Sequence, residues 1–342
     1  MKALFRVDAS LQIGQGHLIR CLTLAQYLQS SGWNSTFACL EHCYSLVKRT
    51  VGTTFSVISL TDSPSEQTGQ LESLEPSGVD LLIVDSYSLS LKFEQACRPW
   101  ARRILVIDDL ADRPHDADIL LDQTYRRSVQ DYLNLVPKDC KILVGSKYAI
   151  LRPMFRQARR SSLVRRDSAR TGIDRILVSL GSTDSQNITE LVLHGIRDSG
   201  LDCAIDVVLA SGGKNIDKII HEIKSFPNGH IYIDTPNMAQ LMLKADLAIG
   251  AGGTTSWERC CLGLPTVAVT LADNQLLINQ MLSADGAVNH LGWYEDLSAS
   301  TLCDAILQIN AKPERLLAMS NVARAICDGK GGSRLLVSLL ED

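Results

Sequence analysis

The stretch ADLAIGAGGTTSWERCCLGLP, residues 245–265, indicates the fold class most directly. An apolar run typical of a buried strand leads into a turn rich in glycine and hydroxyl side chains, and a helical pattern begins near Trp257. Glycines let backbone N–H groups approach a ligand closely, and the N-terminus of a helix favours an anion. This strand–turn–helix unit of an α/β protein differs from a Walker A loop and from a GxGxxG fingerprint. It predicts a diphosphate-binding turn made of Gly252, Gly253, Thr254, Thr255 and Ser256.

Two further features of the C-terminal half also favour nucleotide binding. Glu258 falls on the first turn of the expected helix, where its carboxylate can bind a ribose diol or stabilise the helix dipole. A second glycine turn, SLGSTDSQN at residues 179–187, follows another strand, and we expect Gly181 and Ser182 to face the same ligand. Asp184 or a neighbouring hydroxyl can cap the next helix. Together, the two turns predict a nucleoside diphosphate site in the C-terminal half.

The same alternation of apolar runs and helical patterns extends along all 342 residues and predicts parallel sheets covered on both faces. An arginine- and serine-rich stretch at 156–173 predicts an exposed linker, or a helix with a linker, between two domains. We therefore expect an α/β protein of two doubly wound, Rossmann-like domains, at residues 1–160 and 173–320, that bind a ligand in the cleft between them. Residues 321–342 receive no role.

Composition argues against several classes of protein. The net charge of −4 gives no reason to expect binding to nucleic acid or to an anionic membrane surface. No apolar run approaches the roughly 18–20 residues of a membrane span, and no signal peptide is recognisable. We expect a cytoplasmic monomer that binds neither nucleic acid nor membranes.

Metal binding is not expected either. The 10 cysteines include no CxxC pair, and CLEHC at 39–43 has no second ligand pair at finger spacing, so we expect reduced, mostly buried thiols. Asp108 and Asp109 are adjacent at a strand end, which makes joint chelation of one ion difficult. We expect one of them to bind a neighbouring loop and the other to line the cleft.

Five motifs occur in one order between residue 1 and about residue 295. They are RVDASLQIGQGHLIRC (6–21), VIDDLADRPHDADILLDQ (106–123), YAILRPMF (148–155), AIGAGGTTSWERCCLGLP (248–265) and ADNQ (272–275). The set resembles the PseG family of UDP-sugar hydrolases. The resemblance implies a glycosyltransferase-B fold related to MurG and hydrolysis of UDP-2,4-diacetamido-2,4,6-trideoxy-β-L-altropyranose to UDP and free sugar. It also implies inversion, independence of metals and cofactors, and a place in pseudaminic acid biosynthesis and flagellin glycosylation.

The resemblance also assigns roles to individual residues. It makes His17 the catalytic base, Tyr87 a residue that positions the sugar or the water, and Asn274 a contact of the sugar. Gln275 of the same ADNQ motif is expected at the substrate.

The chemistry of the reaction is compatible with these roles. UDP is a stable leaving anion, so one base that activates water suffices, and a single displacement inverts the anomeric carbon. A histidine, with a reference pKa of about 6.5, is largely neutral near pH 7 and can act as that base. Gly14 and Gly16 form the turn that brings His17 to the end of the first strand. Asp8, which ends that strand, can orient the imidazole or serve as an ordinary loop cap.

Three other functions remain open at this point. A MurG-type glycosyltransferase would pass the sugar to an acceptor, although no strongly basic and apolar N-terminal patch for a lipid acceptor is visible. A UDP-sugar 2-epimerase would need further acid–base groups around C2. A non-catalytic nucleotide-sugar-binding protein would bind UDP without turnover.

Overall fold

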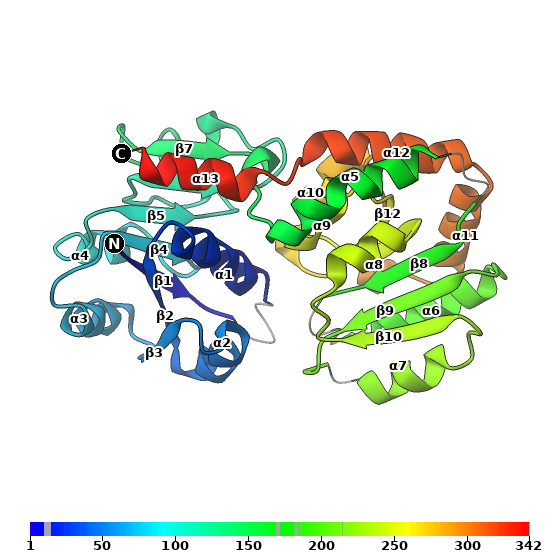
Figure 1. The fold of residues 1–342 in the computed structure, drawn as a ribbon, viewed down its shortest axis with the longest axis horizontal. Helices are drawn as coiled ribbons and strands as arrows, with labels where there is room; N and C mark the ends of the chain where they lie inside the picture. The colour runs from blue at the N-terminus through cyan, green and yellow to red at the C-terminus, as the bar shows by residue number, and fades with distance from the viewer. Residues whose placement is uncertain (10–14, 169–171, 182–183, 185, 214, 342) are drawn as a thin grey trace. The chain divides into compact units, whose positions relative to one another are not determined.

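The computed structural model describes residues 1–9, 15–168, 172–181, 184, 186–213 and 215–341. The chain divides into two compact units (Figure 1): unit 1 contains Met1–Ile150 with Lys330–Asp342, and unit 2 contains Leu151–Gly329. Each unit is built on its own parallel sheet, which confirms the predicted α/β class with two doubly wound sheets. No helix within the described ranges has both the length and the apolar character needed to cross a membrane.

Unit 1 contains a seven-stranded parallel sheet in the order β3-β2-β1-β4-β5-β6-β7. Its strands are β1 (Lys2–Val7), β2 (Asn34–Leu40), β3 (Ser56–Leu60), β4 (Leu81–Asp85), β5 (Ile104–Ile107), β6 (Ile119–Asp122) and β7 (Lys141–Val144). The chain order reverses between β1 and β4, which pair directly with Val7 opposite Asp85. Ligands of doubly wound sheets bind outside the carboxyl ends of strands at such a switch point.

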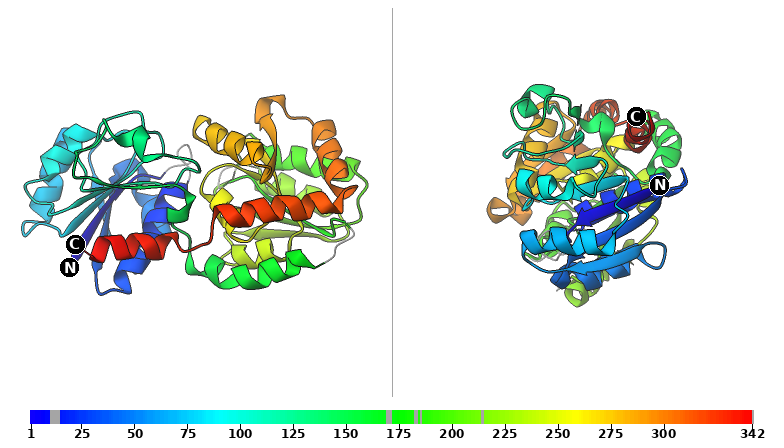
Figure 2. Two further views of the ribbon diagram at one scale, coloured as in Figure 1. Left: turned by 90° about the horizontal axis from the view of Figure 1, so that it is seen from above. Right: turned by 90° about the vertical axis from the view of Figure 1, so that its left-hand side faces the viewer.

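Helices cover both faces of this sheet (Figures 1 and 2). They are α1 (Gly16–Gln29), α2 (Tyr44–Val51), α3 (Pro64–Leu74), α4 (Leu91–Cys97) and α13 (Gly331–Leu340), with short 3-10 turns η1 (Glu41–Cys43), η2 (Val129–Tyr132) and η3 (Ser146–Tyr148). The last helix, α13, packs on α1 and η3 and adds Leu335 and Leu339 to the core on that face. A Cβ on Gly332 would lie 2.5 Å from the Tyr27 ring, so the glycine allows the close approach of α13 to α1. Residues 331–340, for which the sequence predicts no role, are therefore part of unit 1.

Unit 2 contains a six-stranded parallel sheet in the order β10-β9-β8-β11-β12-β13. Its strands are β8 (Arg175–Ser179), β9 (Ala204–Leu209), β10 (Gly229–Ile233), β11 (Leu247–Ala251), β12 (Thr266–Thr270) and β13 (Val288–Trp293). Its helices are α5 (Pro153–Asp167), α6 (Ile188–Asp198), α7 (Ile216–Ile223), α8 (Met238–Lys244), α9 (Thr254–Cys261), α10 (Asp273–Ala284), α11 (Ala299–Asn310) and α12 (Pro313–Ile326), with a 3-10 turn η4 (Tyr294–Asp296). The edge strand β13 was not predicted, because its sequence VNHLGW lacks a continuous apolar run.

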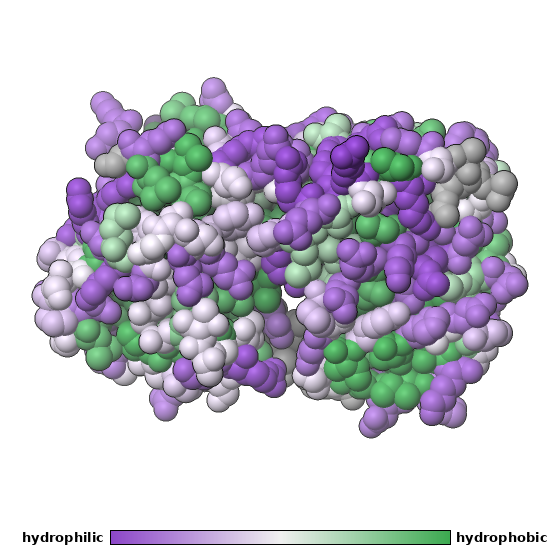
Figure 3. All heavy atoms as spheres, in the orientation of Figure 1, coloured by the Kyte–Doolittle hydropathy of each residue, from purple (hydrophilic) through white to green (hydrophobic). Residues whose placement is uncertain are grey.

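The arginine-rich segment after residue 152 forms the 15-residue helix α5, which agrees with the second of the two predicted alternatives, a helix with a linker, and not with an exposed linker alone. Arg159 and Arg166 each donate to three backbone carbonyls at the C-terminal ends of α8, α9 and α12. Such carbonyls lack partners within their own helices, and a cation there also complements the helix dipole. Side chains over α5 and α12 are mainly hydrophilic on the face seen in Figure 3, yet Arg166 is only 7% exposed. The helix binds to unit 2, so that unit begins at Leu151 and not at residue 173.

Candidate functional site

His17 lies at the switch point of unit 1. It is the second residue of α1, directly after Gly16, while Gly14 lies outside the described residues. The residue is 7% exposed, and its Nδ1 lies 2.5 Å from Oδ1 of Asp85, the last residue of β4. The pair forms because α1 starts beside the carboxyl end of β4, which adjoins β1 in the sheet.

The state of Asp85 determines which nitrogen of His17 carries the proton. Burial opposes the ionisation of Asp85, but the Arg20 guanidinium and the His17 imidazole hold the pKa of its carboxyl well below the usual range. An ionised carboxylate has no proton to give, so at 2.5 Å Nδ1 of His17 must donate to it. Arg20 Nη2 also lies 3.1 Å from Nδ1, but a guanidinium can only donate, so this longer contact is not a hydrogen bond once Nδ1 carries the proton. In the neutral imidazole the lone pair then lies on Nε2, which is the nitrogen able to accept a proton.

Arg20 and its partners hold this pair in place. Arg20 donates through Nε and Nη2 to the two oxygens of Asp85, each at 2.7 Å, and through Nη1 to Asp109 at 2.9 Å. The Tyr87 hydroxyl donates to Asp109 at 3.2 Å. The Tyr87 ring meets the His17 ring edge to face, with ring centres 4.6 Å apart. The structure therefore brings the predicted residues His17 and Tyr87 together.

The carboxylate in contact with His17 is Asp85, and not Asp8, for which the sequence left open the roles of imidazole partner and loop cap. Asp8 is buried, accepts a hydrogen bond from the Leu40 backbone N–H at 2.9 Å and pairs with Arg6 at 2.8 Å. It therefore holds the end of β1 against β2, as a loop cap does. The sequence shows Asp85 at the end of the apolar run LLIVD, but only the structure shows that this strand adjoins β1 in the sheet.

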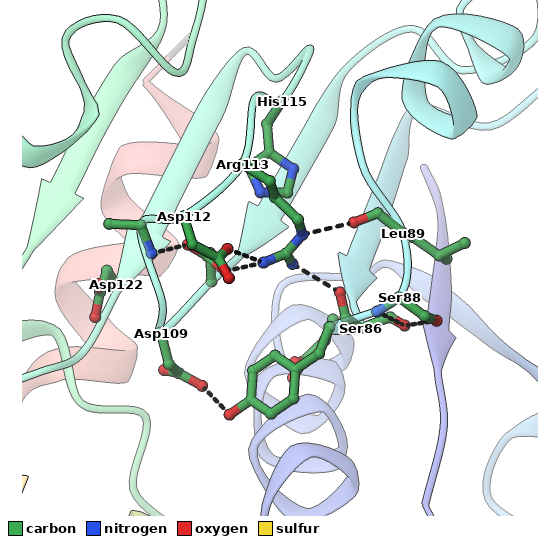
Figure 4. A network of polar contacts seen from close by, with 12 residues as sticks. Ser86, Ser88, Leu89, Asp109, Asp112, Arg113, His115 and Asp122 are labelled. Carbon is green, nitrogen blue, oxygen red and sulfur yellow. Dashed lines mark hydrogen bonds and ion pairs between the residues drawn. The ribbon is translucent and has the colours of Figure 1, made fainter. Parts of the chain in front are cut away.

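Arg113 anchors the loop that carries Tyr87. No motif or spacing in the sequence predicts this role. It donates to the backbone oxygens of Ser86 and Leu89, each at 3.0 Å, and to Asp108 at 3.1 Å (Figure 4). Asp108 also accepts from the Ala111 N–H at 2.8 Å in its own loop, and the Tyr132 hydroxyl of η2 lies 2.8 Å from it, so one of the two adjacent aspartates binds a neighbouring segment. The loops that follow β4 and β5 are thus joined into one support for the site.

The glycine turn of unit 2 lies between β11 and α9. The helix begins at Thr254 and not near Trp257, so Thr254, Thr255 and Ser256 form its first turn. This first turn has no acidic residue and no capping hydrogen bond from a described side chain. The Ser256 N–H donates to the Gly253 carbonyl at 2.9 Å, so the turn offers the N–H groups of Thr254 and Thr255 to an anion.

Each glycine of the GAGG sequence meets a different steric requirement. A Cβ on Gly250 would lie 2.6 Å from Arg259 Nη1, and one on Gly252 would lie 2.8 Å from the Cβ of Gln275. Gly253 has a φ of +101°, which side-chain-bearing residues rarely adopt. The glycines thus fix the shape of the turn and bring it close to α10.

Glu258 lies in the second turn of α9, because the helix starts earlier than the sequence suggested. Its side chain is 9% exposed and pairs with Arg152 Nη2 at 3.1 Å. Burial raises the pKa of Glu258, and the Arg152 guanidinium opposes that rise. The prediction that Glu258 stabilises the helix dipole from the first turn of α9 is therefore wrong.

The remaining predicted residues of unit 2 lie around the carboxyl edge of its sheet. Gln275 accepts from the Leu271 N–H at 3.0 Å, and exposed Asn274 lies in the first turn of α10. Gly181 follows β8 with a φ of +95°, and Ser182 lies outside the described residues. Asp184 caps α6, since its carboxylate accepts from the N–H groups at the start of that helix.

No group of three or more His, Cys, Asp or Glu side chains in the described part of the chain is arranged to hold a metal ion. The buried carboxylates of unit 1 have other partners: the Tyr132 hydroxyl lies 2.8 Å from both Asp108 and Asp122, which share its one hydrogen. Asp122 also pairs with Arg127 at 2.5 Å.

Comparison with known proteins identifies the family. The chain is 30% identical over 278 residues to the UDP-2,4-diacetamido-2,4,6-trideoxy-β-L-altropyranose hydrolase of Campylobacter jejuni. The aligned region covers 80% of this chain and 93% of that protein. The chain belongs to this UDP-sugar hydrolase family. Residues 175–329 of this family member match the glycosyltransferase family 28 C-terminal domain, so the glycine turn and α9 lie within the matched region.

Solved structures show the fold of this hydrolase family member. MurG of Acinetobacter baumannii superposes with a TM-score of 0.71 at 14% identity and covers 100% of this chain and 99% of its own. The UDP-GlcNAc 2-epimerase of Neisseria meningitidis, bound to UDP-GlcNAc, superposes with a TM-score of 0.64 at 15% identity and covers 100% of both chains. The protein therefore has a glycosyltransferase-B fold, and at these identities the two likenesses concern the fold alone.

Proposed function

We propose that the protein hydrolyses UDP-2,4-diacetamido-2,4,6-trideoxy-β-L-altropyranose to UDP and the free sugar. The observation that carries this proposal is the pairing of His17 Nδ1 with Asp85 at 2.5 Å, which leaves Nε2 as the basic nitrogen of a fixed imidazole. The Campylobacter jejuni relative supplies the substrate, because its name specifies hydrolysis of this UDP-sugar.

In the proposed reaction, Nε2 of His17 accepts a proton from water as the water oxygen bonds to the anomeric carbon. The bond from that carbon to the UDP oxygen breaks, and its electron pair leaves with UDP. A single displacement of this kind inverts the configuration. Asp85 stabilises the imidazolium that forms, and Tyr87 positions the water or the sugar. General-base catalysis of this kind contributes about 10²–10⁴-fold to the rate.

The nucleotide is proposed to bind to unit 2. The uncapped first turn of α9, at Thr254–Ser256, suits a diphosphate, and Gly252 and Gly253 shape the approach to it. Glu258 is assigned to the ribose hydroxyls, with Arg152 favouring its ionised form. Gly181, Ser182, Asn274 and Gln275 complete the proposed contacts with UDP and the sugar.

The decisive experiment replaces the base. His17→Ala is expected to reduce hydrolysis by about 10²–10⁴-fold while UDP affinity stays unchanged, because the alanine removes the proton acceptor and leaves unit 2 intact. His42→Ala, at a histidine whose side chain is 58% exposed in the same unit, is the matched control. Wild-type turnover in His17→Ala would contradict the mechanism.

A second candidate function is transfer of the sugar to an acceptor, which the match to the glycosyltransferase family 28 domain favours. NMR of the reaction without any acceptor distinguishes the two. Hydrolysis releases free sugar whose first anomer is inverted, whereas a transferase leaves the UDP-sugar intact until an acceptor is added. Binding of UDP without any turnover would point instead to a binding protein.

The finer features of the proposal follow from the same family. We propose a cytoplasmic monomer that needs neither metal nor cofactor and whose product enters pseudaminic acid biosynthesis and flagellin glycosylation. Retention of full activity in excess EDTA, and a monomer mass by light scattering, are the expected results.

A further inference from the structure

A buried guanidinium lies directly beneath the glycine turn of unit 2. Arg259, on α9, is 3% exposed. Its Nη2 donates to the Ala251 carbonyl at 2.6 Å and to Ser256 Oγ at 3.1 Å, so it links the last residue of β11 to the first turn of α9. Gly250 leaves the space for this group, since a Cβ there would lie 2.6 Å from Nη1.

The positive charge of Arg259 lacks an anionic partner of its own. Among the described residues no carboxylate forms an ion pair with Arg259: its neighbour Glu258 attracts it, but the Glu258 carboxylate pairs with Arg152. The Nε–H of Arg259 is buried without a hydrogen-bond partner among those residues. Burial lowers the pKa of Arg259 to about 10, so it remains a cation at neutral pH. A buried charge without a counter-ion is costly, and so it favours the arrival of an anion.

The position of this charge specifies which anion would balance it. Arg259 lies beneath the turn whose outer side carries the uncapped N–H groups of α9, and the positive end of the helix dipole adds to the same field. An anion bound at the turn is therefore attracted by two positive charges. One is the positive end of the helix dipole, and the other is Arg259, which holds the backbone of the turn. Uridine carries no charge to exploit this field, whereas a diphosphate does.

We propose that Arg259 is a positioning residue that holds the turn at residues 252–256 in its anion-binding shape and balances the charge of a bound diphosphate. The inference rests on the proposed function and concerns the same nucleotide site. It assigns the preference for a nucleoside diphosphate over an uncharged nucleoside to a side chain that does not touch the ligand.

The test compares the affinities for UDP and uridine in wild type and Arg259→Met, by calorimetry for UDP and by competition with UDP for uridine. The Met variant is expected to lose about 10- to 100-fold of UDP affinity, the range for charge-assisted hydrogen bonds, while uridine affinity stays the same. Arg259→Lys keeps the charge but cannot bridge two acceptors. Its ratio of UDP affinity to uridine affinity is therefore expected to lie between the ratios of wild type and Arg259→Met, at least about threefold below wild type.

Arg166→Met is the matched control, because Arg166 is equally buried and donates to backbone carbonyls at the C-terminal ends of α8 and α9. It is expected to lower stability without changing the UDP-to-uridine ratio. An unchanged ratio in Arg259→Met overturns the inference, and if that variant fails to fold, an unchanged ratio in Arg259→Lys overturns it equally. Failure of wild type to prefer UDP over uridine would instead refute the nucleotide site of the proposed function.

Discussion

At the scale of single residues, Asp85 has the most influence on the site of unit 1. Its carboxylate receives His17, both donors of the Arg20 fork and, at 3.3 Å, the Cys21 thiol. Four donors on one buried carboxylate fix its orientation, so the imidazole attached to it has one tautomer and one direction. The glycine–histidine context was sufficient to predict His17, but its partner required knowledge of which strand adjoins β1. Strand order is a tertiary property, which is why the sequence suggested Asp8, the nearest carboxylate along the chain, as one candidate for the partner.

Asp85→Asn is expected to lower the rate of hydrolysis by about 10²–10⁴-fold with little change in UDP affinity. An amide beside Arg20 no longer requires a proton on Nδ1 of His17, so Nε2 loses its fixed role as acceptor. Steady-state kinetics on the UDP-sugar measure the effect. Because the two residues act as one unit, the double variant with His17→Ala should be no slower than His17→Ala alone. Additive losses would show that Asp85 acts independently of the base.

The same residue predicts how stability responds to acid. The pKa of Asp85 is lowered in the folded state, so its ion pairs contribute fully above the unfolded value of about 3.9 and are lost as the pH falls below it. Wild type should exceed Asp85→Asn in Tm at pH 5, and that margin should shrink as the pH falls below 4. Thermal unfolding followed by circular dichroism measures both proteins. A margin that is constant down to pH 3 would contradict the assignment.

At the scale of elements, the strand–turn–helix of β11 and α9 was well predicted, because its glycines mark a local backbone requirement. For helix α5 the sequence left two alternatives, an exposed linker or a helix with a linker, because arginine and serine are typical of both. Its arginines bind carbonyls of helices distant in sequence, such as Arg159 with Cys327 at 2.9 Å. A contact between segments so far apart produces no pattern in the neighbouring sequence. The arginines of α5 were therefore visible in the sequence, but the carbonyls that they bind were not.

Gly252→Ala tests the shape of the turn. The added Cβ would lie 2.8 Å from the Cβ of Gln275 and 3.0 Å from Asn279 Oδ1, so the turn or α10 must shift. We expect UDP affinity to fall by at least about tenfold, since backbone donors lose their aim when displaced. Gly286→Ala is the control: its φ of +82° causes strain, but nothing lies within 4 Å of its Cβ. That variant should lose about 1 kcal/mol of stability or slightly more and keep its UDP affinity. Equal UDP affinities in the two variants would exclude the steric role of Gly252.

At the scale of the whole molecule, the sequence predicted two α/β units correctly but not how the chain divides between them. Unit 1 is discontinuous, because residues after Gly329 return to it as α13. Nothing in GGSRLLVSLL distinguishes a helix that completes a distant sheet from one that continues unit 2. The apolar residues of α13 find their place only once α1 and the sheet exist, so this assignment depends on the assembled core.

The discontinuity makes a prediction about the stability of unit 1. Leu335 on α13 is fully buried in the core shared with α1, whereas Val337 on the same helix is 51% exposed. Leu335→Ala should therefore cost about 2–5 kcal/mol, the range for truncating a buried leucine, and Val337→Ala should change stability by no more than about 0.5 kcal/mol. Hydrogen exchange should show the lost protection in α1 and the sheet of unit 1, with the β8–β13 sheet unchanged, because each unit has its own core. Loss of protection in β11 and α9 instead would mean that α13 stabilises unit 2, and that the end of the chain was assigned to the wrong unit.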